Sequence, residues 1–138
     1  MNKLFIVMSH TLTDAQIDDF IANYGTTEFV TLQDVNPELS KLCQNLDPRL
    51  STANIRELAV TICSIASSEK ATHLYIAGEP SLVFWVSMYA EKLWSAPYIN
   101  KMTCVQSTTK RISKDIPQPD GSVKKISSFS HVQWRELL

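Results

Sequence analysis

The chain has 138 residues, of which 44% are hydrophobic and 20% are charged, a composition typical of a globular domain and not of a disordered or membrane-spanning chain. Its length suits one domain with a real core, and no run of about 18 apolar residues predicts a membrane span. The net charge of −1 divides into −5 for residues 1–100 and +4 for residues 101–138. The C-terminal segment is therefore expected to face an anionic partner or, equally, to form a solvated hairpin.

Five consecutive apolar side chains at residues 4–8 predict a strand buried on both faces of a parallel sheet. A capping box of Thr13 and Gln16 then predicts the start of a helix, and Gly25 predicts its end. The residues between strand and helix lie beside free helix N–H groups at the carboxyl end of a strand. Open α/β sheets bind ligands there, and helix N-termini favour anions.

The remaining apolar periodicity predicts alternating strands and helices. They are expected as a strand at 26–32, an irregular connection or short helix at 33–50, a helix from Ser51 or Thr52 through Ala66, a strand at 72–77, a helix at 82–94 and a strand at 102–106. With right-handed crossovers this order predicts an α/β fold with a Rossmann-like, mainly parallel sheet and flanking helices.

A C-terminal β-hairpin follows, because Asp120-Gly121 is a strong turn signal. A two-residue loop would place Lys110 opposite His131 and Arg111 opposite Ser130, although prolines near the tip disfavour a strict register. The expected organisation is a single domain over residues 1–138, with a Rossmann-like core at 1–107 and a β-hairpin extension at 108–138.

Three loops, at residues 9–11, 78–81 and 107–111, are expected to meet at the carboxyl edge of the sheet. They offer hydroxyls, backbone N–H groups, an imidazole, a carboxylate and two cations, which are the groups that proteins use to bind phosphate. The dinucleotide, P-loop, nucleophile-elbow and zincin motifs are absent. The candidate catalytic residues are His10, Ser9 and Arg111, and the candidate ligand-binding residues are Ser9, His10, Thr11, Gly78, Glu79, Ser81, Ser107, Thr108, Thr109, Lys110, Arg111 and His131.

The expected roles differ among these residues. The ordinary pKa of a histidine suits His10 for proton transfer at neutral pH, whereas His131 fits either a ligand contact or cross-strand packing. Arg111 suits a bidentate phosphate contact and Lys110 a point charge. Ser107-Thr108-Thr109 fits either a phosphate contact or the end of a Thr-rich strand. Glu79 fits a ribose hydroxyl or, alternatively, the start of a helix.

The three cysteines, Cys43, Cys63 and Cys104, are far apart and lack metal-ligand spacing. They predict reduced thiols in a cytoplasmic protein and no metal site. A signal peptide is not expected, because a polar pair and a capped helix stand where a small-residue cleavage site would lie.

Three segments resemble a known family: Leu4 to Gln16, Ser107-Thr108-Thr109-Lys110-Arg111, and Asp120-Gly121-Ser122-Val123-Lys124-Lys125 through Phe129-Ser130-His131-Val132-Gln133-Trp134-Arg135. They are similar to small CRISPR-associated proteins of type III loci, standalone CARF-like domains grouped with the accessory ring nucleases. The chain departs from the family pattern at 78–82, where Gly-Glu-Pro-Ser-Leu stands in place of Gly followed by Asp and small residues.

The resemblance implies a homodimer that binds and cleaves cyclic tetra-adenylate, the second messenger of type III systems, without a metal or cofactor. Attack by a ribose 2′-OH would give linear di-adenylate ending in a 2′,3′-cyclic phosphate and would switch off antiviral signalling. Neither a membrane nor a long nucleic acid is implied as a partner. Two other interpretations stay open: a non-catalytic sponge or sensor of the same ligand, and an unrelated α/β nucleotide-binding or structural protein.

Overall fold

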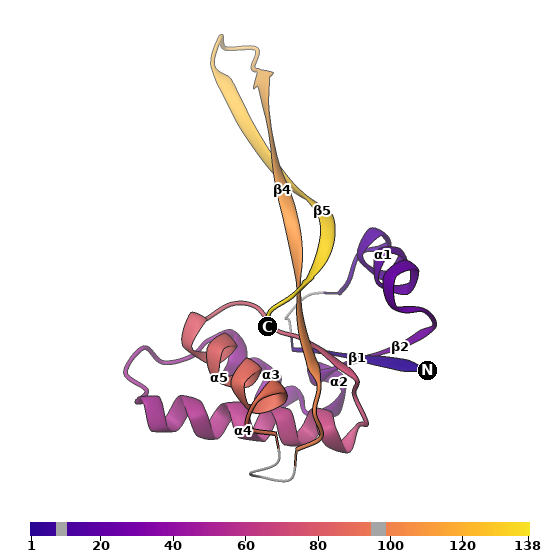
Figure 1. Ribbon diagram of the computed structural model, residues 1–138. Coiled ribbons are helices and arrows are strands. Elements are labelled where there is room, and N and C mark those ends of the chain that lie inside the picture. Colours follow the sequence, from indigo (N-terminus) through magenta and orange to yellow (C-terminus); the bar gives the residue numbers. More distant parts are fainter. Residues whose placement is uncertain (8–10, 95–98) are drawn as a thin grey trace.

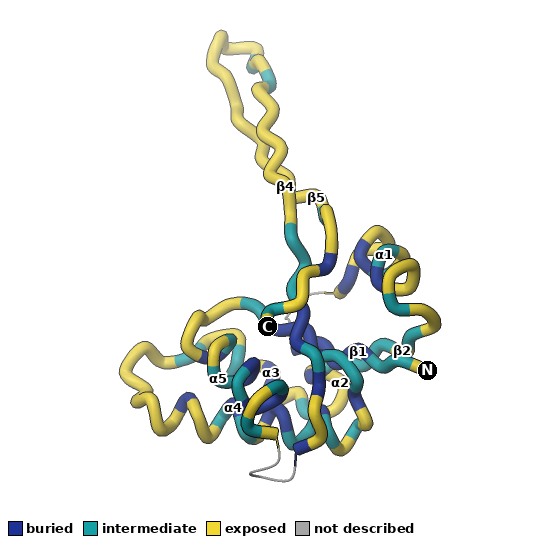
Figure 2. Tube along the Cα trace, viewed as in Figure 1, coloured by how far each residue is buried: buried dark blue, intermediate teal, exposed yellow. Residues whose placement is uncertain are grey.

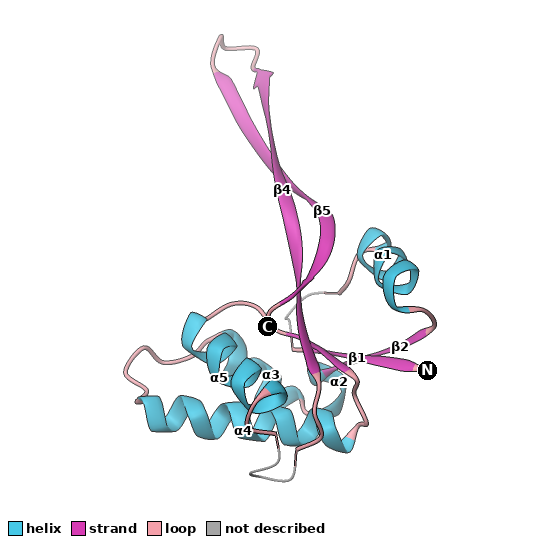
Figure 3. Ribbon diagram, in the orientation of Figure 1, coloured by secondary structure: helices cyan, strands magenta, loops and turns pink. Residues whose placement is uncertain are grey.

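The computed structural model describes residues 1–7, 11–94 and 99–138. Its strands are β1 (Asn2–Ile6), β2 (Thr27–Thr31), β3 (His73–Tyr75), β4 (Thr103–Pro117) and β5 (Val123–Glu136), and its helices are α1 (Asp14–Tyr24), α2 (Leu32–Val35), α3 (Pro37–Gln44), α4 (Thr52–Ser68) and α5 (Pro80–Glu91). The strands form one sheet in the order β2-β1-β3-β4-β5. All pairs are parallel except β4 with β5, so the mainly parallel sheet with flanking helices and a C-terminal hairpin is confirmed (Figure 3).

Helices cover both faces of the sheet. Successive side chains of β1 point to opposite faces, and each set is buried under different helices. Phe5 and Val7 belong to the larger buried cluster, which includes the inner faces of α4 and α5. Leu4 and Ile6 belong to a second cluster that packs against α1 and the base of β5. Figure 1 shows α4 and α5 together on one side and α1 on the other. Within the described ranges, no helix has both the length and the apolar character that a bilayer crossing requires.

Local sequence signals account for the helix ends. Thr13 and Gln16 form the predicted capping box of α1, and Gly25 follows its last turn with a φ of 88°, which a side chain would disfavour. Ser51, and not Thr52, caps α4. The segment expected to be irregular or a short helix contains α2 and α3.

The C-terminal hairpin extends far beyond the sheet. β3 pairs with β4 only as far as Tyr75 opposite Val105, whereas β4 and β5 continue to pair up to Pro117 opposite Val123. We call residues 110–130 the arm. Its backbone stands away from the core in Figure 1, and Figure 2 shows it exposed along nearly its whole length.

Two sequence-based expectations for this hairpin are wrong. Residues 107–111 are not a loop but part of β4, because β5 supplies hydrogen-bond partners past the point where β3 ends. Lys110 lies opposite Ser130, and Arg111 lies opposite Phe129. The turn spans residues 118–122, five instead of two, since Pro117 precedes it and Pro119 lies within it, and this shifts the register by one position. β4 also runs without a break through the expected boundary between residues 107 and 108.

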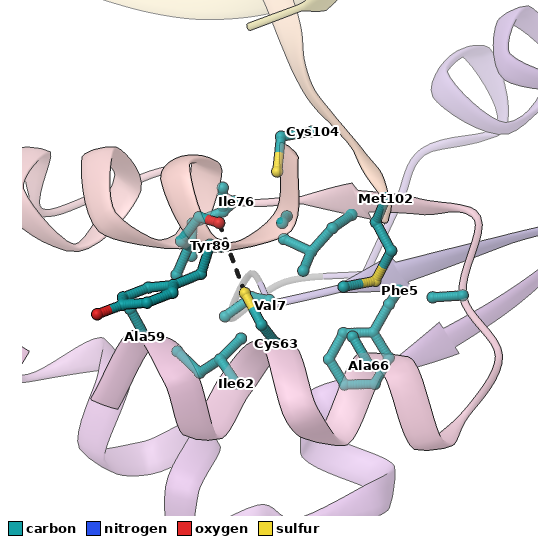
Figure 4. Close-up of a cluster of buried hydrophobic side chains, with 14 of the residues drawn as sticks. Phe5, Val7, Ala59, Ile62, Cys63, Ala66, Ile76, Tyr89, Met102 and Cys104 are labelled. Carbon is teal, nitrogen blue, oxygen red and sulfur yellow. Dashed lines mark hydrogen bonds between the residues drawn. The ribbon is translucent and has the colours of Figure 1, made fainter. Parts of the chain in front are cut away.

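The cysteines lie in or beside the larger buried cluster, and all three are free thiols. In Figure 4, Cys63 points from α4 toward α5, where its Sγ donates to the Val86 carbonyl at 3.5 Å. Burial raises the pKa of Cys43 to about 11 and that of Cys63 to about 12, and it also raises the pKa of Cys104.

We therefore expect slow alkylation of the native protein. Thiolate is the reactive form, so at pH 8 only about one Cys43 molecule in a thousand is reactive, and the rate should rise about tenfold per pH unit up to about pH 11. Mass spectrometry after iodoacetamide treatment should detect Cys43 labelling first, whereas all three thiols should react quickly in guanidinium. Rapid labelling of native Cys63 at pH 8 would contradict this packing.

Candidate functional site

The carboxyl ends of β1 and β3 lie side by side at the centre of the sheet. The backbone N–H of Val7 donates to the carbonyl of Tyr75 at 3.0 Å. The chain runs from β1 to β2 on one side and from β3 to β4 on the other side. The strand order therefore reverses between β1 and β3. Ligands of open α/β sheets bind in the crevice at such a point.

A pocket of about 340 Å³ lies at this edge, on the side that faces α3. Val7, Ala77, Gly78 and Glu79 line it together with residues 43–46. Gly78 has a φ of 108°, a conformation that favours glycine and lets the chain turn sharply from β3 into α5. The predicted loop 78–81 therefore lies at the predicted edge of the sheet.

Glu79 has a structural role in this loop. Its carboxylate accepts a hydrogen bond from the Leu82 N–H at 2.8 Å and caps α5. Of the two roles considered for this residue, the structure shows the one at the start of a helix. Gly78 and Ser81 are exposed beside it and are free to contact a ligand.

On the α1 side of the same edge, four side chains form a chain of hydrogen bonds. Gln16 Nε2 donates to Ser107 Oγ at 3.2 Å. Ser107 Oγ lies 2.6 Å from His131 Nδ1, and His131 Nε2 lies 2.8 Å from Asp19 Oδ2. We call Ser107, His131 and Asp19 the relay.

With Asp19 ionised and His131 neutral, the chemistry of the partners sets the direction of these bonds. An ionised Asp19 can only accept, so His131 Nε2–H donates to it. The other ring nitrogen of a neutral imidazole then accepts from the Ser107 hydroxyl. A hydroxyl, an imidazole and a carboxylate in this order form the arrangement that withdraws a proton from a hydroxyl in many hydrolases.

The relay lies largely out of water. The His131 side chain is 4% exposed and the Asp19 side chain is 31% exposed. Burial raises the pKa of the neighbouring Tyr75, and its hydrogen bond to Ser107 partly offsets that increase. Low solvent access strengthens each hydrogen bond in the relay and holds its groups in place.

Trp134 fixes the base of the hairpin to α1. Its indole Nε1 donates to the Gln16 carbonyl at 2.9 Å, and its ring packs edge-on against Phe20 and Tyr75 with centroid separations of 5.4 and 4.9 Å. Gln16 thus joins the capping box of α1, through its side chain, to Ser107 on β4. Gln16, in the first turn of α1, therefore contacts Ser107 of the predicted segment 107–111.

The residues predicted on β4 do not all face one site. Side chains alternate along a strand, so Ser107, Thr109 and Arg111 share one face, whereas Thr108 and Lys110 lie on the other. Arg111 is about 13 Å beyond Ser107 at 3.3 Å per residue. Its guanidinium donates to Ser127 Oγ on the arm at 3.0 and 3.3 Å.

Three further sequence-based expectations have different outcomes. Ser9 and His10 lie outside the described residues. Thr11 is described and exposed just before α1. His131, for which cross-strand packing and a ligand role were both open, packs at the hairpin base and also belongs to the relay.

Asp19 was missed by the sequence analysis, and Gln16 was found there only as a capping residue. Asp19 lies 112 positions before His131, and no spacing rule connects the two residues. The described residues contain no group of three His, Cys, Asp or Glu side chains that could hold a metal ion.

Comparisons with known proteins extend over both core and arm. The family model described as Uncharacterized protein MJ1673 family matches residues 2–135. The chain is similar to the Uncharacterized protein MJ1673 of Methanocaldococcus jannaschii, with 29% identity over 137 residues that cover 99% of this chain and 97% of that protein. No solved structure matches the chain.

Proposed function

The chain belongs to the Uncharacterized protein MJ1673 family, and we propose that it is a metal-independent ring nuclease that binds and cleaves cyclic tetra-adenylate. In this role it would end the antiviral signalling of a type III CRISPR system, as its resemblance to standalone CARF-like proteins implies. The observation that carries the proposal is the relay of Ser107, His131 and Asp19 at the carboxyl edge, beside the start of α1.

Cleavage of this ligand needs a proton acceptor and a proton donor but no outside nucleophile. The ribose 2′-oxygen attacks the adjacent phosphorus, the P–O2′ bond forms and the P–O5′ bond breaks. The 2′-OH takes the place of the Gln16 amide as donor to Ser107, and its proton passes through Ser107 to His131. The leaving 5′-oxygen takes a proton from a donor at the edge, for which the sequence offers His10. Two such steps release two linear di-adenylates, each ending in a 2′,3′-cyclic phosphate.

A non-catalytic binding protein is the second candidate. It is favoured by the burial of His131 and by the partners that Ser107 already has in Gln16 and His131. In that case, the relay only clamps the hairpin to α1. The same edge would hold the ligand for storage or sensing.

Product analysis in EDTA separates these functions. Purified protein incubated with cyclic tetra-adenylate should yield linear di-adenylate on chromatography. An intact ring that is nevertheless bound tightly would favour the binding protein, and the absence of binding would exclude both candidates.

Two variants test the assigned roles within the same assay. His10→Ala should slow single-turnover cleavage while binding survives, since it removes the proton-transfer group. Arg111→Ala should weaken binding about 10- to 100-fold through loss of a charge-assisted contact. Lys101→Ala is the matched control, because Lys101 lies just before β4, at the opposite edge of the sheet. Unchanged kinetics in His10→Ala would remove its proposed role.

A further inference from the structure

The arm exposes an apolar row that its own core does not cover. On the face of β4 that carries the even-numbered residues, Ile112, Ile116 and Ile126 lie on neighbouring ladder positions, since Ile126 pairs with Lys114 between the other two. We call this the isoleucine face. Ile112 is 49% exposed and Ile126 is 43% exposed.

Lysines surround this row. Lys110, Lys114 and Lys124 lie on the same face, because each is an even-numbered β4 residue or is paired with one. An apolar centre with a charged margin is the usual composition of a protein–protein interface. A strand pair that bound only phosphate would leave the three isoleucines in water.

A two-stranded ribbon also needs a surface to cover it. An isolated hairpin is only marginally stable in water, and beyond Val105 the strand β4 has β5 as its one partner in the described sheet. Every arm residue except Ile116 and Gln118 is exposed, as Figure 2 shows. The arm therefore gains little stabilisation from contacts with the core of its own chain.

The distribution of charge favours a second copy of the chain as the partner. The arm carries five basic and two acidic residues, a balance of +3, and the other 117 residues carry eight basic and twelve acidic residues, a balance of −4. The acidic part that complements the arm thus belongs to this same sequence. We propose that the isoleucine face of the arm packs on the acidic core of a second copy of the chain, so that two arms are exchanged in a symmetric dimer.

This inference extends the proposed function but does not depend on the ligand, because the dimer is measured in its absence. Sedimentation velocity at about 20 µM protein should detect a dimer. Ile126→Asp places a charge in the proposed interface twice per dimer. If each copy weakens binding about 30-fold, as for an interface hot spot, the dissociation constant should rise about 1,000-fold.

Phe129→Asp is the matched control. Phe129 is 69% exposed and pairs with Arg111 on the opposite face of the ribbon, so this variant should stay dimeric. Both variants should keep the wild-type circular dichroism melting curve at a concentration where each is monomeric, since neither side chain belongs to a buried cluster.

Two outcomes would overturn the proposal. The first is a wild-type protein that remains monomeric at this concentration. The second is an Ile126→Asp variant that stays fully dimeric. If the monomeric wild type retards RNA or DNA in a mobility-shift assay, and Lys114→Glu abolishes that interaction, the partner of the arm is a nucleic acid instead. A dimer that is disrupted by Ile126→Asp and yet binds no cyclic tetra-adenylate would support the arm exchange and reject the proposed function.

Discussion

Replacing Trp134 by alanine is expected to lower the free energy of unfolding by about 3–5 kcal/mol, the usual cost of removing a buried tryptophan. Its side chain fills the space between α1 and the sheet and is 7% exposed. The substitution also removes the hydrogen bond from the indole to the Gln16 carbonyl, a bond of a kind that contributes about 1 kcal/mol net. Guanidinium titration followed by circular dichroism measures the change.

Trp94→Ala is the control for this experiment. Trp94 is 40% exposed, so its substitution should lower the free energy of unfolding clearly less. A loss below about 1 kcal/mol for Trp134→Ala, on the scale of a surface substitution, would show that the hairpin base does not pack on α1 as described.

Asp19→Asn is expected to reduce single-turnover cleavage of cyclic tetra-adenylate by about 100-fold or more, the usual contribution of a positioned acid–base group. The amide keeps the size of the carboxylate but cannot stabilise a protonated His131. Asp19 touches no reacting atom in the proposed mechanism and acts through His131, so its substitution should lower the rate constant with little effect on affinity.

Asp18→Asn provides the matched control, because Asp18 is the exposed neighbour on α1 and, among the described residues, has no hydrogen bond to the relay. A wild-type cleavage rate in both variants would mean that the Ser107–His131–Asp19 arrangement is a structural clamp. A similar loss of rate in both variants would point to the charge of α1 instead of to the relay.

Signals between nearby residues were sufficient to predict much of the fold. Thr13 and Gln16 are three positions apart, and their capping box depends on that spacing alone. The parallel strands follow from short apolar runs, and the hairpin follows from Asp120-Gly121. In each case the physical cause lies within a few residues of its effect.

The features that sequence reasoning missed depend on pairing across long distances. Ser107 through Arg111 looked like a loop because their own composition is polar, but β5 holds them in a strand. The relay brings Asp19 next to His131 only after α1 has packed on the hairpin base. The residues expected in a loop lie in a two-stranded ribbon with two faces. Of residues 107–111, only Ser107, Thr109 and Arg111 share the face of β4 on which the relay lies.

The proposed function requires that this edge of the sheet lets a ribose hydroxyl attack its own phosphodiester. Mass spectrometry of the products formed in EDTA and water enriched in ¹⁸O tests it directly, because transesterification takes no oxygen from solvent. We expect linear di-adenylate with an unlabelled 2′,3′-cyclic phosphate. An intact ring, or a terminal phosphate that carries ¹⁸O from the first turnover, would contradict it.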